Sequence, residues 1–206
     1  MLQASFSSQY VEAGLDEVGR GCLAGPVVAA AVIFPLRFVH PLLNDSKKLK
    51  KAHRISLEKV IKEEALAWAV AEVSHKEIDR INILNASFLA MHKALDDIFQ
   101  QKKEGKISTT PELLLVDGNR FKPYNFIAHQ CVVKGDAKFY SIAAASVLAK
   151  TYRDRLMEKL SKKYPQYGWE KNVGYPTTQH RQAIATHGLT PYHRKTFKVR
   201  PISDKK

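Results

Sequence analysis

The chain has 206 residues, of which 45% are hydrophobic, and its 33 Lys and Arg against 20 Asp and Glu give a formal net charge of +13. This length suits one globular domain with a sizeable core, and no apolar stretch approaches the roughly 20 residues of a membrane span, which argues against a membrane protein. The basic balance favours a nucleic-acid partner, while two cysteines, Cys22 and Cys131, exclude a disulfide framework and a zinc-binding spacing.

The first third of the chain predicts three strands. Residues 1–10 lack the basic start and apolar stretch of a secretory signal, so we expect an N-terminal tail on a cytoplasmic protein. Residues 11–18 and 27–34 are predicted strands on either side of a glycine-rich turn, and the continuous apolar run of the second strand implies burial on both faces. Polar caps at 44–46 precede a basic helix ending near 64, and the alternation over 65–73 predicts a third strand.

The middle of the chain alternates helices with strands. Ser74 and Glu77 have the spacing of a capping box, and the apolar stripe over residues 81–98 predicts a core helix. A polar stretch from 100 to 110 is the predicted loop before a strand that ends at Asp117. Residues 130–133 then form a short strand that delivers Asp136 to its end.

The last part of the chain is predicted to be helical. A long helix over 141–163 presents an inward stripe that includes Tyr152, with Arg153 on another face, and the Tyr-Pro pair at 164–165 ends it. A final helix over 178–187 is closed by Gly188. The pattern indicates an α/β domain with a mixed sheet and a smaller helical C-terminal part.

Four acids are candidates for one metal site. Asp16 and Glu17 interrupt an apolar run, where an uncompensated buried acid is costly, while Asp117 and Asp136 end predicted strands. Phosphodiester hydrolysis is served by divalent metals held by carboxylate oxygens. Considered alone, Asp117 and Asp136 are each explained as ordinary turn residues, because Asp117 precedes a glycine and Asp136 follows one. Neighbours on a regular strand point to opposite faces, so a site shared by Asp16 and Glu17 requires the strand to end, twist or bulge there.

Seven motifs follow one another along the chain. They are GLDEVGRG at 14–21, NDSKKL at 44–49, IDRINIL at 78–84, DGNR at 117–120, VKGD at 133–136, AAASVLAK at 143–150 and GYPT at 174–177. In this order they resemble the ribonuclease HII family, the bacterial type 2 ribonucleases H, and the opening octet carries the strongest likeness. The resemblance covers roughly residues 11 to 200, and the motifs together are far more specific than any one alone.

The resemblance implies a ribonuclease H-like, mixed five-stranded sheet flanked by helices, with a catalytic core over 11–165 and a C-terminal helical substrate-binding region over 166–206 that completes one functional domain. It implies a metal-dependent endonuclease that cuts the RNA strand of RNA–DNA hybrids and incises 5′ to single ribonucleotides in duplex DNA, leaving 3′-hydroxyl and 5′-phosphate ends. Such an enzyme works in replication and repair, is monomeric, and uses Mg²⁺ or Mn²⁺, two ions in the catalytic complex.

The resemblance also implies roles for single residues. The catalytic and metal-binding set comprises Asp16, Glu17, Asp117 and Asp136. The turn of Gly19, Arg20 and Gly21 would read the 2′-hydroxyl, Tyr175 would stack on the adjoining deoxyribose, and Lys47 and Lys48 would contact phosphate.

Plainer interpretations stay open for these substrate residues. Arg20 equally fits a simple phosphate clamp, Tyr175 a packed aromatic with a wet hydroxyl, and the lysine pair a solvated helix start. The chain departs from the family pattern at Cys22, where proline is usual, and at 171–173, where a histidine and a lysine are common. These departures bear on the junction-reading turn and on the approach of the tyrosine loop.

Two other functions are compatible with the basic charge. One is a non-catalytic binder of duplex nucleic acid in which the acids are structural. The other is a nuclease of ribonuclease H fold that acts on DNA alone, against which the glycine-rich turn beside Asp16 argues, since glycines let main-chain groups approach a 2′-hydroxyl closely.

Overall fold

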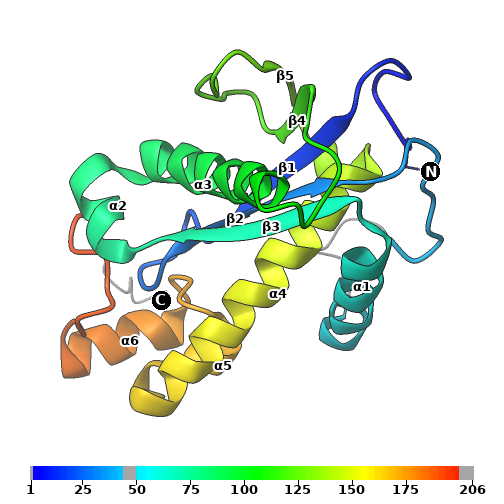
Figure 1. Ribbon diagram of the computed structural model, residues 1–206. Helices are drawn as coiled ribbons and strands as arrows, with labels where there is room; N and C mark the ends of the chain where they lie inside the picture. Colours follow the sequence, from blue (N-terminus) through cyan, green and yellow to red (C-terminus); the bar gives the residue numbers. More distant parts are fainter. Residues whose placement is uncertain (1, 44–49, 200–206) are drawn as a thin grey trace.

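A computed structural model describes residues 2–43 and 50–199 and shows one mixed sheet between helices (Figure 1). The strands are β1 (Glu12–Val18), β2 (Val27–Ile33), β3 (Ala67–Val73), β4 (Leu113–Asp117) and β5 (Ala128–Val132). The α-helices are α1 (Lys51–Glu64), α2 (His75–Ile81), α3 (Ile83–Lys103), α4 (Tyr140–Lys163), α5 (Trp169–Asn172) and α6 (Thr178–His187), with the 3₁₀ turns η1 (Gly135–Ala137) and η2 (Pro165–Tyr167).

The sheet has the strand order β3-β2-β1-β4-β5. β1 is antiparallel to β2, as β2 is to β3, whereas β1 and β4 run parallel, as do β4 and β5. The predicted α/β class and mixed five-stranded sheet are confirmed.

Helices cover both faces of this sheet. In Figure 1, α3 lies across one face, and α4 runs diagonally over the other with α1 beside it. Along β1 the side chains alternate, so that Leu15 belongs to the core under α3 while Gly14 abuts the backbone of Ser141 in α4. β2 is buried at every position, as its unbroken apolar run predicts.

Most predicted elements begin and end within two residues of their expected bounds. Ser74 caps α2 by accepting a hydrogen bond from the Glu77 amide, but the Glu77 carboxylate pairs with Arg80 instead of closing the capping box. α3 continues to Lys103, so the first part of the expected 100–110 loop is helical, in keeping with its helix-favouring Gln and Lys residues. The predicted caps at 44–46 lie outside the described residues.

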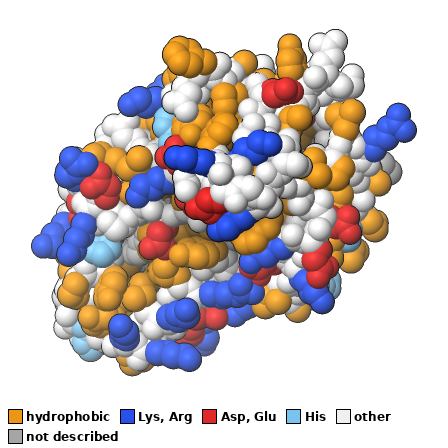
Figure 2. Space-filling model, in the orientation of Figure 1, with side chains coloured by type: hydrophobic (Ala, Val, Ile, Leu, Met, Phe, Trp, Pro, Cys, Tyr) orange, Lys and Arg blue, Asp and Glu red, His pale blue; other side chains and the backbone are white. Residues whose placement is uncertain are grey.

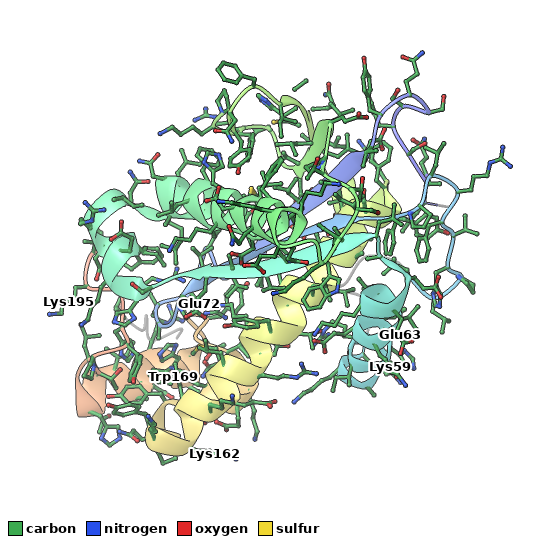
Figure 3. All side chains as sticks on the ribbon, in the orientation of Figure 1. Lys59, Glu63, Glu72, Lys162, Trp169 and Lys195 are labelled. Carbon is green, nitrogen blue, oxygen red and sulfur yellow. The ribbon has the colours of Figure 1, made fainter. Side chains whose placement is uncertain are left out.

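The inward side predicted for α4 is wrong at Tyr152 and Arg153, although Leu156 and Leu160 of the predicted stripe do pack against the C-terminal core. Tyr152 is 41% exposed and donates a hydrogen bond to Glu72 of β3, whereas Arg153 is 0% exposed. The reason is that α4 passes from the sheet onto the C-terminal region, so different sides of the helix face inward along its length. Figure 3 shows Glu72 between β3 and α4, and Trp169 in the C-terminal region beside the end of α4.

The C-terminal region packs around the end of α4. α6 spans the predicted residues and is closed by Gly188, while the short α5 and η2 were not expected from the sequence. Trp169 and Tyr167 form a small aromatic core there with Met157 of α4. Among the described residues, no helix combines the length and the apolar character that a bilayer span requires.

Candidate active site

The four acids lie at or just beyond the carboxyl ends of neighbouring strands. Asp16 and Glu17 are near the end of β1, Asp117 is the last residue of β4, and Asp136 lies in η1 directly after β5. Since β1, β4 and β5 run parallel, their carboxyl ends share one edge of the sheet, the usual position of a site in such sheets. The topology therefore brings together residues more than a hundred positions apart.

Asp16 and Asp117 are matched in register. The last parallel pair is Leu15 with Val116, so the next position sets Asp16 beside Asp117. Asp16 is 5% exposed and accepts hydrogen bonds from the Glu17 amide, at 2.7 Å, and from Ser146 of α4. Burial, followed by the negative charges of Glu17 and Asp117, raises the pKa of Asp16 well above its ordinary value. This carboxyl group is crowded by like charge on the α4 side of the sheet.

Glu17 lies on the other face of β1. Pairing with β2 is regular through Val18, so the strand neither ends nor bulges at the acids, and neighbouring side chains point to opposite faces as ordinary strand geometry requires. The Glu17 carboxylate accepts a hydrogen bond from Arg20 at 3.0 Å and faces a hollow of about 310 Å³ that Asp117 and Arg120 also line. Burial raises the pKa of Glu17, and the Arg20 charge opposes that rise.

The turn after β5 ties the remaining two acids together. The Gly135 amide donates to Asp117 Oδ1 at 2.7 Å, and the next residue, Asp136, is 3% exposed. A side chain at Gly135 would meet Ile142 of α4, so this tight turn suits glycine. One oxygen of Asp117 is thereby held in place beside Asp136.

The donor chemistry of these acids suits a hard divalent cation. Carboxylate oxygens are the ligands that Mg²⁺ and Mn²⁺ prefer, and a cation would relieve the repulsion that raises the pKa of Asp16. Within residues 2–43 and 50–199, however, no three Asp, Glu, His or Cys side chains are arranged to ligate one ion together. The residues suit a metal site in their chemistry and position, but among the described residues their side chains do not form a complete coordination site.

The turn after β1, residues 19–21, and the loop that carries Tyr175, residues 173–177, form a surface next to the acids. We call the second segment the tyrosine loop. Gly19 is buried with φ +95°, and a Cβ there would collide with Arg153 Nε and lie 2.9 Å from the Pro26 carbonyl, so glycine is required. A Cβ at Gly21 would lie 3.8 Å from the ring of Tyr175, which is 39% exposed. The Tyr175 hydroxyl hydrogen-bonds the Cys22 thiol. The turn and the tyrosine predicted to bind substrate are thus adjacent.

The sequence profile described as Ribonuclease HII matches residues 13–200 of this chain. A ribonuclease HII of Bacteroides fragilis is 57% identical over 199 residues, which cover 97% of this chain and 94% of the relative. The chain belongs to the ribonuclease HII family. It is therefore an endoribonuclease, with ribonuclease H activity on RNA–DNA hybrids, and the non-catalytic binder is excluded.

Solved structures agree with this family. The ribonuclease H2 of Pyrococcus horikoshii superposes with a TM-score of 0.71 at 27% identity, covering 91% of this chain and 94% of that one. A ribonuclease HII of Archaeoglobus fulgidus, solved in complex with PCNA, gives a TM-score of 0.72 at 26% identity, covering 94% and 98%. The ribonuclease H-like fold of the enzyme is thereby established.

Sequence reasoning missed several residues that build the site. Ser146 supports Asp16, and two buried arginines, Arg153 and Arg194, stand behind the turn. Arg153 was predicted to lie on another face of its helix, and Arg194 is one of many scattered cations, so no local pattern marks either. Lys47 and Lys48 lie outside the described residues.

Positive charge is not confined to the site. Figure 2 shows Lys and Arg side chains spread over the face in view, with Asp and Glu among them. Such a distribution attracts a polyanion without selecting a sequence or a sugar. The spread of charge therefore provides no selectivity for one kind of sugar.

Proposed function

We propose that this enzyme, besides cutting the RNA strand of hybrids, incises duplex DNA on the 5′ side of single embedded ribonucleotides. The observation that carries the proposal is the adjacency of three features: the glycine turn at 19–21, the ring of Tyr175 over Gly21, and the acids, of which Glu17 lies two positions before the turn. The residues proposed to recognise one sugar, the turn and Tyr175, therefore lie beside the acids proposed to hydrolyse the phosphodiester bond.

The turn suits recognition of a 2′-hydroxyl. That hydroxyl is the group that distinguishes RNA from DNA, and it can both donate and accept hydrogen bonds. The exposed Gly21 leaves the backbone open to close approach, and the exposed Arg20 side chain can exchange Glu17 for a phosphate. Tyr175 offers a flat apolar ring to the neighbouring deoxyribose.

We propose that Asp16, Glu17, Asp117 and Asp136 hold divalent ions, Mg²⁺ or Mn²⁺, two in the catalytic complex. Asp16 and Glu17 lie on opposite faces of β1, and Asp117, whose charge acts on both of them, connects the two sides of the set. Bound ions of this kind supply charge neutralisation at the phosphate and an activated water. Attack of water at phosphorus on the 5′ side of the ribonucleotide, with departure of the 3′-oxygen of the preceding nucleotide, leaves a 3′-hydroxyl and a 5′-phosphate. Ser146 and the Gly135 amide orient the carboxyl groups of Asp16 and Asp117 for this task.

Hydrogen bonds support treating the core, 11–165, and the C-terminal region, 166–206, as one functional unit. The Leu23 amide donates to the Gly174 carbonyl at 2.7 Å, and the Gly25 amide donates to the Tyr192 carbonyl at 2.9 Å. We expect a monomer acting in the cytoplasm on ribonucleotide-bearing DNA during replication and repair.

The test uses three duplexes of one sequence: all-DNA, one embedded ribonucleotide, and an RNA–DNA hybrid. The proposal expects a metal-dependent nick 5′ to the single ribonucleotide, cutting of the hybrid, and no cutting of all-DNA. A nuclease that acts on DNA alone would cut the all-DNA duplex as readily as the duplex with one ribonucleotide, and that outcome would defeat the proposal.

A further inference from the structure

Two arginines are buried directly behind the turn that follows β1. Arg153 of α4 is 0% exposed, and Arg194, in the segment after α6, is 2% exposed. In the described part of the chain neither guanidinium forms an ion pair, and all their recorded hydrogen bonds go to backbone carbonyls. Burying a charge in this way is costly unless its donors are satisfied, so the arrangement calls for a function.

Arg194 holds the turn itself. Its Nη2 donates to the Gly19 carbonyl at 2.6 Å, its Nη1 to the Arg20 carbonyl at 2.8 Å, and its Nε to the Gly25 carbonyl at 3.0 Å. The planar fork of a guanidinium can satisfy several acceptors at fixed angles, which a lysine ammonium cannot reproduce. Two consecutive peptide groups of the turn are therefore fixed by one side chain.

Fixing those two carbonyls also aims two amides. In a trans peptide the N–H points opposite to the C=O, and the structure contains no cis peptide bond. With the carbonyls of Gly19 and Arg20 directed at Arg194, the amides of Arg20 and Gly21 point away from it. Neither amide donates a hydrogen bond to any acceptor in residues 2–43 or 50–199. Successive amides presented in this way form a concave donor site for an oxygen ligand.

Arg153 fixes the other side of the same unit. It donates to the carbonyls of Ala24 and Pro26, each at 3.0 Å, and to Val173 of the tyrosine loop at 2.7 Å. The Arg194 amide also donates to the Leu23 carbonyl at 2.8 Å. The turn and the loop that carries Tyr175 are therefore held in one geometry from behind.

We infer that Arg194 is a positioning residue for sugar discrimination, because it holds the amides of Arg20 and Gly21 toward the substrate's 2′-hydroxyl. This inference rests on the proposed function and deepens it. Figure 3 shows Lys195, the next residue, at the outer margin of the molecule, whereas Arg194 is buried.

The test measures a discrimination ratio with active enzyme. This ratio is the inhibition constant of an all-DNA duplex divided by the KM of the same duplex with one ribonucleotide, so a high ratio means strong preference for the ribonucleotide. We expect Arg194→Lys to lower this ratio at least about tenfold while the variant stays folded, since a site built to bond a hydroxyl discriminates strongly only when its donors are in place. Arg155→Lys is the matched control, because Arg155 pairs with Glu58 on an exposed side of α4, and its ratio should equal that of the parent.

Chemical rescue provides a second readout. Removing the side chain in Arg194→Ala leaves space for a free guanidinium ion, so millimolar guanidinium should restore the ratio while urea at the same concentration should not. A folded Arg194→Lys with the parental ratio, or a folded Arg194→Ala that guanidinium leaves unchanged, overturns the inference. A parent enzyme that shows no discrimination, or does not nick at the ribonucleotide, instead overturns the proposed function.

Discussion

The ring of Tyr175 lies over Gly21, with Cε1 3.8 Å from the point where a side chain at Gly21 would begin. These residues are far apart in the sequence and come from the two regions expected to bind substrate. Their contact defines a narrow space between the turn and the tyrosine, next to Asp16 and Glu17. We expect substitutions on either side of that space to change the binding of substrate.

Alanine at the two glycines of the turn should separate folding from recognition. Gly21→Ala meets only ordinary contact distances, so we expect stability within about 0.5 kcal/mol of the parent, as for neutral surface changes, with a raised KM for ribonucleotide-bearing duplex. Gly19→Ala must strain a φ of +95° and displace Arg153, so we expect a loss of about 2–4 kcal/mol. Urea unfolding and steady-state kinetics check both; equal stability of the two variants would refute the packing described for Gly19.

Two substitutions of Tyr175 should have different effects. Tyr175→Phe keeps the ring and loses only the hydroxyl bond to Cys22, so its KM should rise by no more than about threefold, the worth of one modest hydrogen bond. Tyr175→Ala removes the ring, and its KM should rise tenfold or more, by about the 1–3 kcal/mol of a stacking contact. If both variants behave alike, the ring does not contact substrate.

Asp16→Asn should lower the activity of the enzyme and raise the stability of its fold. The pKa of Asp16 is raised above its ordinary 3.8, so this group stabilises the fold below that pH, and the contribution is lost as pH rises through the folded-state pKa. At pH 7 without metal this stabilisation is reduced, and Asn, which does not titrate, should raise the unfolding free energy by about 1–2 kcal/mol. Activity should fall at least about a hundredfold, with duplex affinity largely kept.

The metal dependence of stability gives a control for Asp16→Asn. Adding Mg²⁺ or Mn²⁺ should raise the melting temperature of the parent more than that of the variant, because bound ligand stabilises the folded state. A variant that cuts like the parent, or gains the same thermal shift from metal, would show that Asp16 is not a metal ligand.

His180 and His193 are buried side by side in the C-terminal region, with their Nε2 atoms 3.1 Å apart. We expect this pair to make the stability of the fold sensitive to acid. Burial, followed by the charge of His180, lowers the pKa of His193 from 6.5 to about 4. A histidine with a lowered pKa stabilises the folded state fully above pH 6.5, and this stabilisation is lost as the pH falls toward 4. We expect the free energy of unfolding to decrease by about 2–3 kcal/mol over that range. His193→Asn keeps an acceptor for the Thr190 amide and should lose less stability on acidification.

Urea unfolding at pH 7 and pH 5 measures this difference, with the exposed His53→Asn as control. Trp169 donates to His180 at 3.0 Å, so its fluorescence reports directly on the cluster. Equal acid sensitivity in the parent and in His193→Asn would assign the effect to other groups.

Periodicity and turn chemistry were sufficient to predict most elements. The unbroken apolar run of β2 and the cap and glycine that bound α6 depend only on neighbouring residues, and the structure follows them. Acids at strand ends, as at Asp117, could also be located, because a parallel sheet places such ends on one edge.

Other features depend on partners distant in sequence. The inward face of α4 changes where the helix leaves the sheet, so a single stripe misplaced Tyr152 and Arg153. Arg194 could not be distinguished from surface cations, because its acceptors are carbonyls of residues 19, 20 and 25. A site shared by Asp16 and Glu17 was expected to need β1 to end, twist or bulge at the acids. Pairing with β2 stays regular through Val18, so Glu17 lies on the face opposite Asp16.

The most direct measurement is cleavage of duplex DNA that contains one ribonucleotide, with the ends mapped at single-nucleotide resolution. We expect a single nick on the 5′ side of the ribonucleotide in Mg²⁺ or Mn²⁺, with 3′-hydroxyl and 5′-phosphate ends, none in EDTA and none in all-DNA duplex. An intact strand in the presence of metal, or equal cutting of all-DNA duplex, would contradict it.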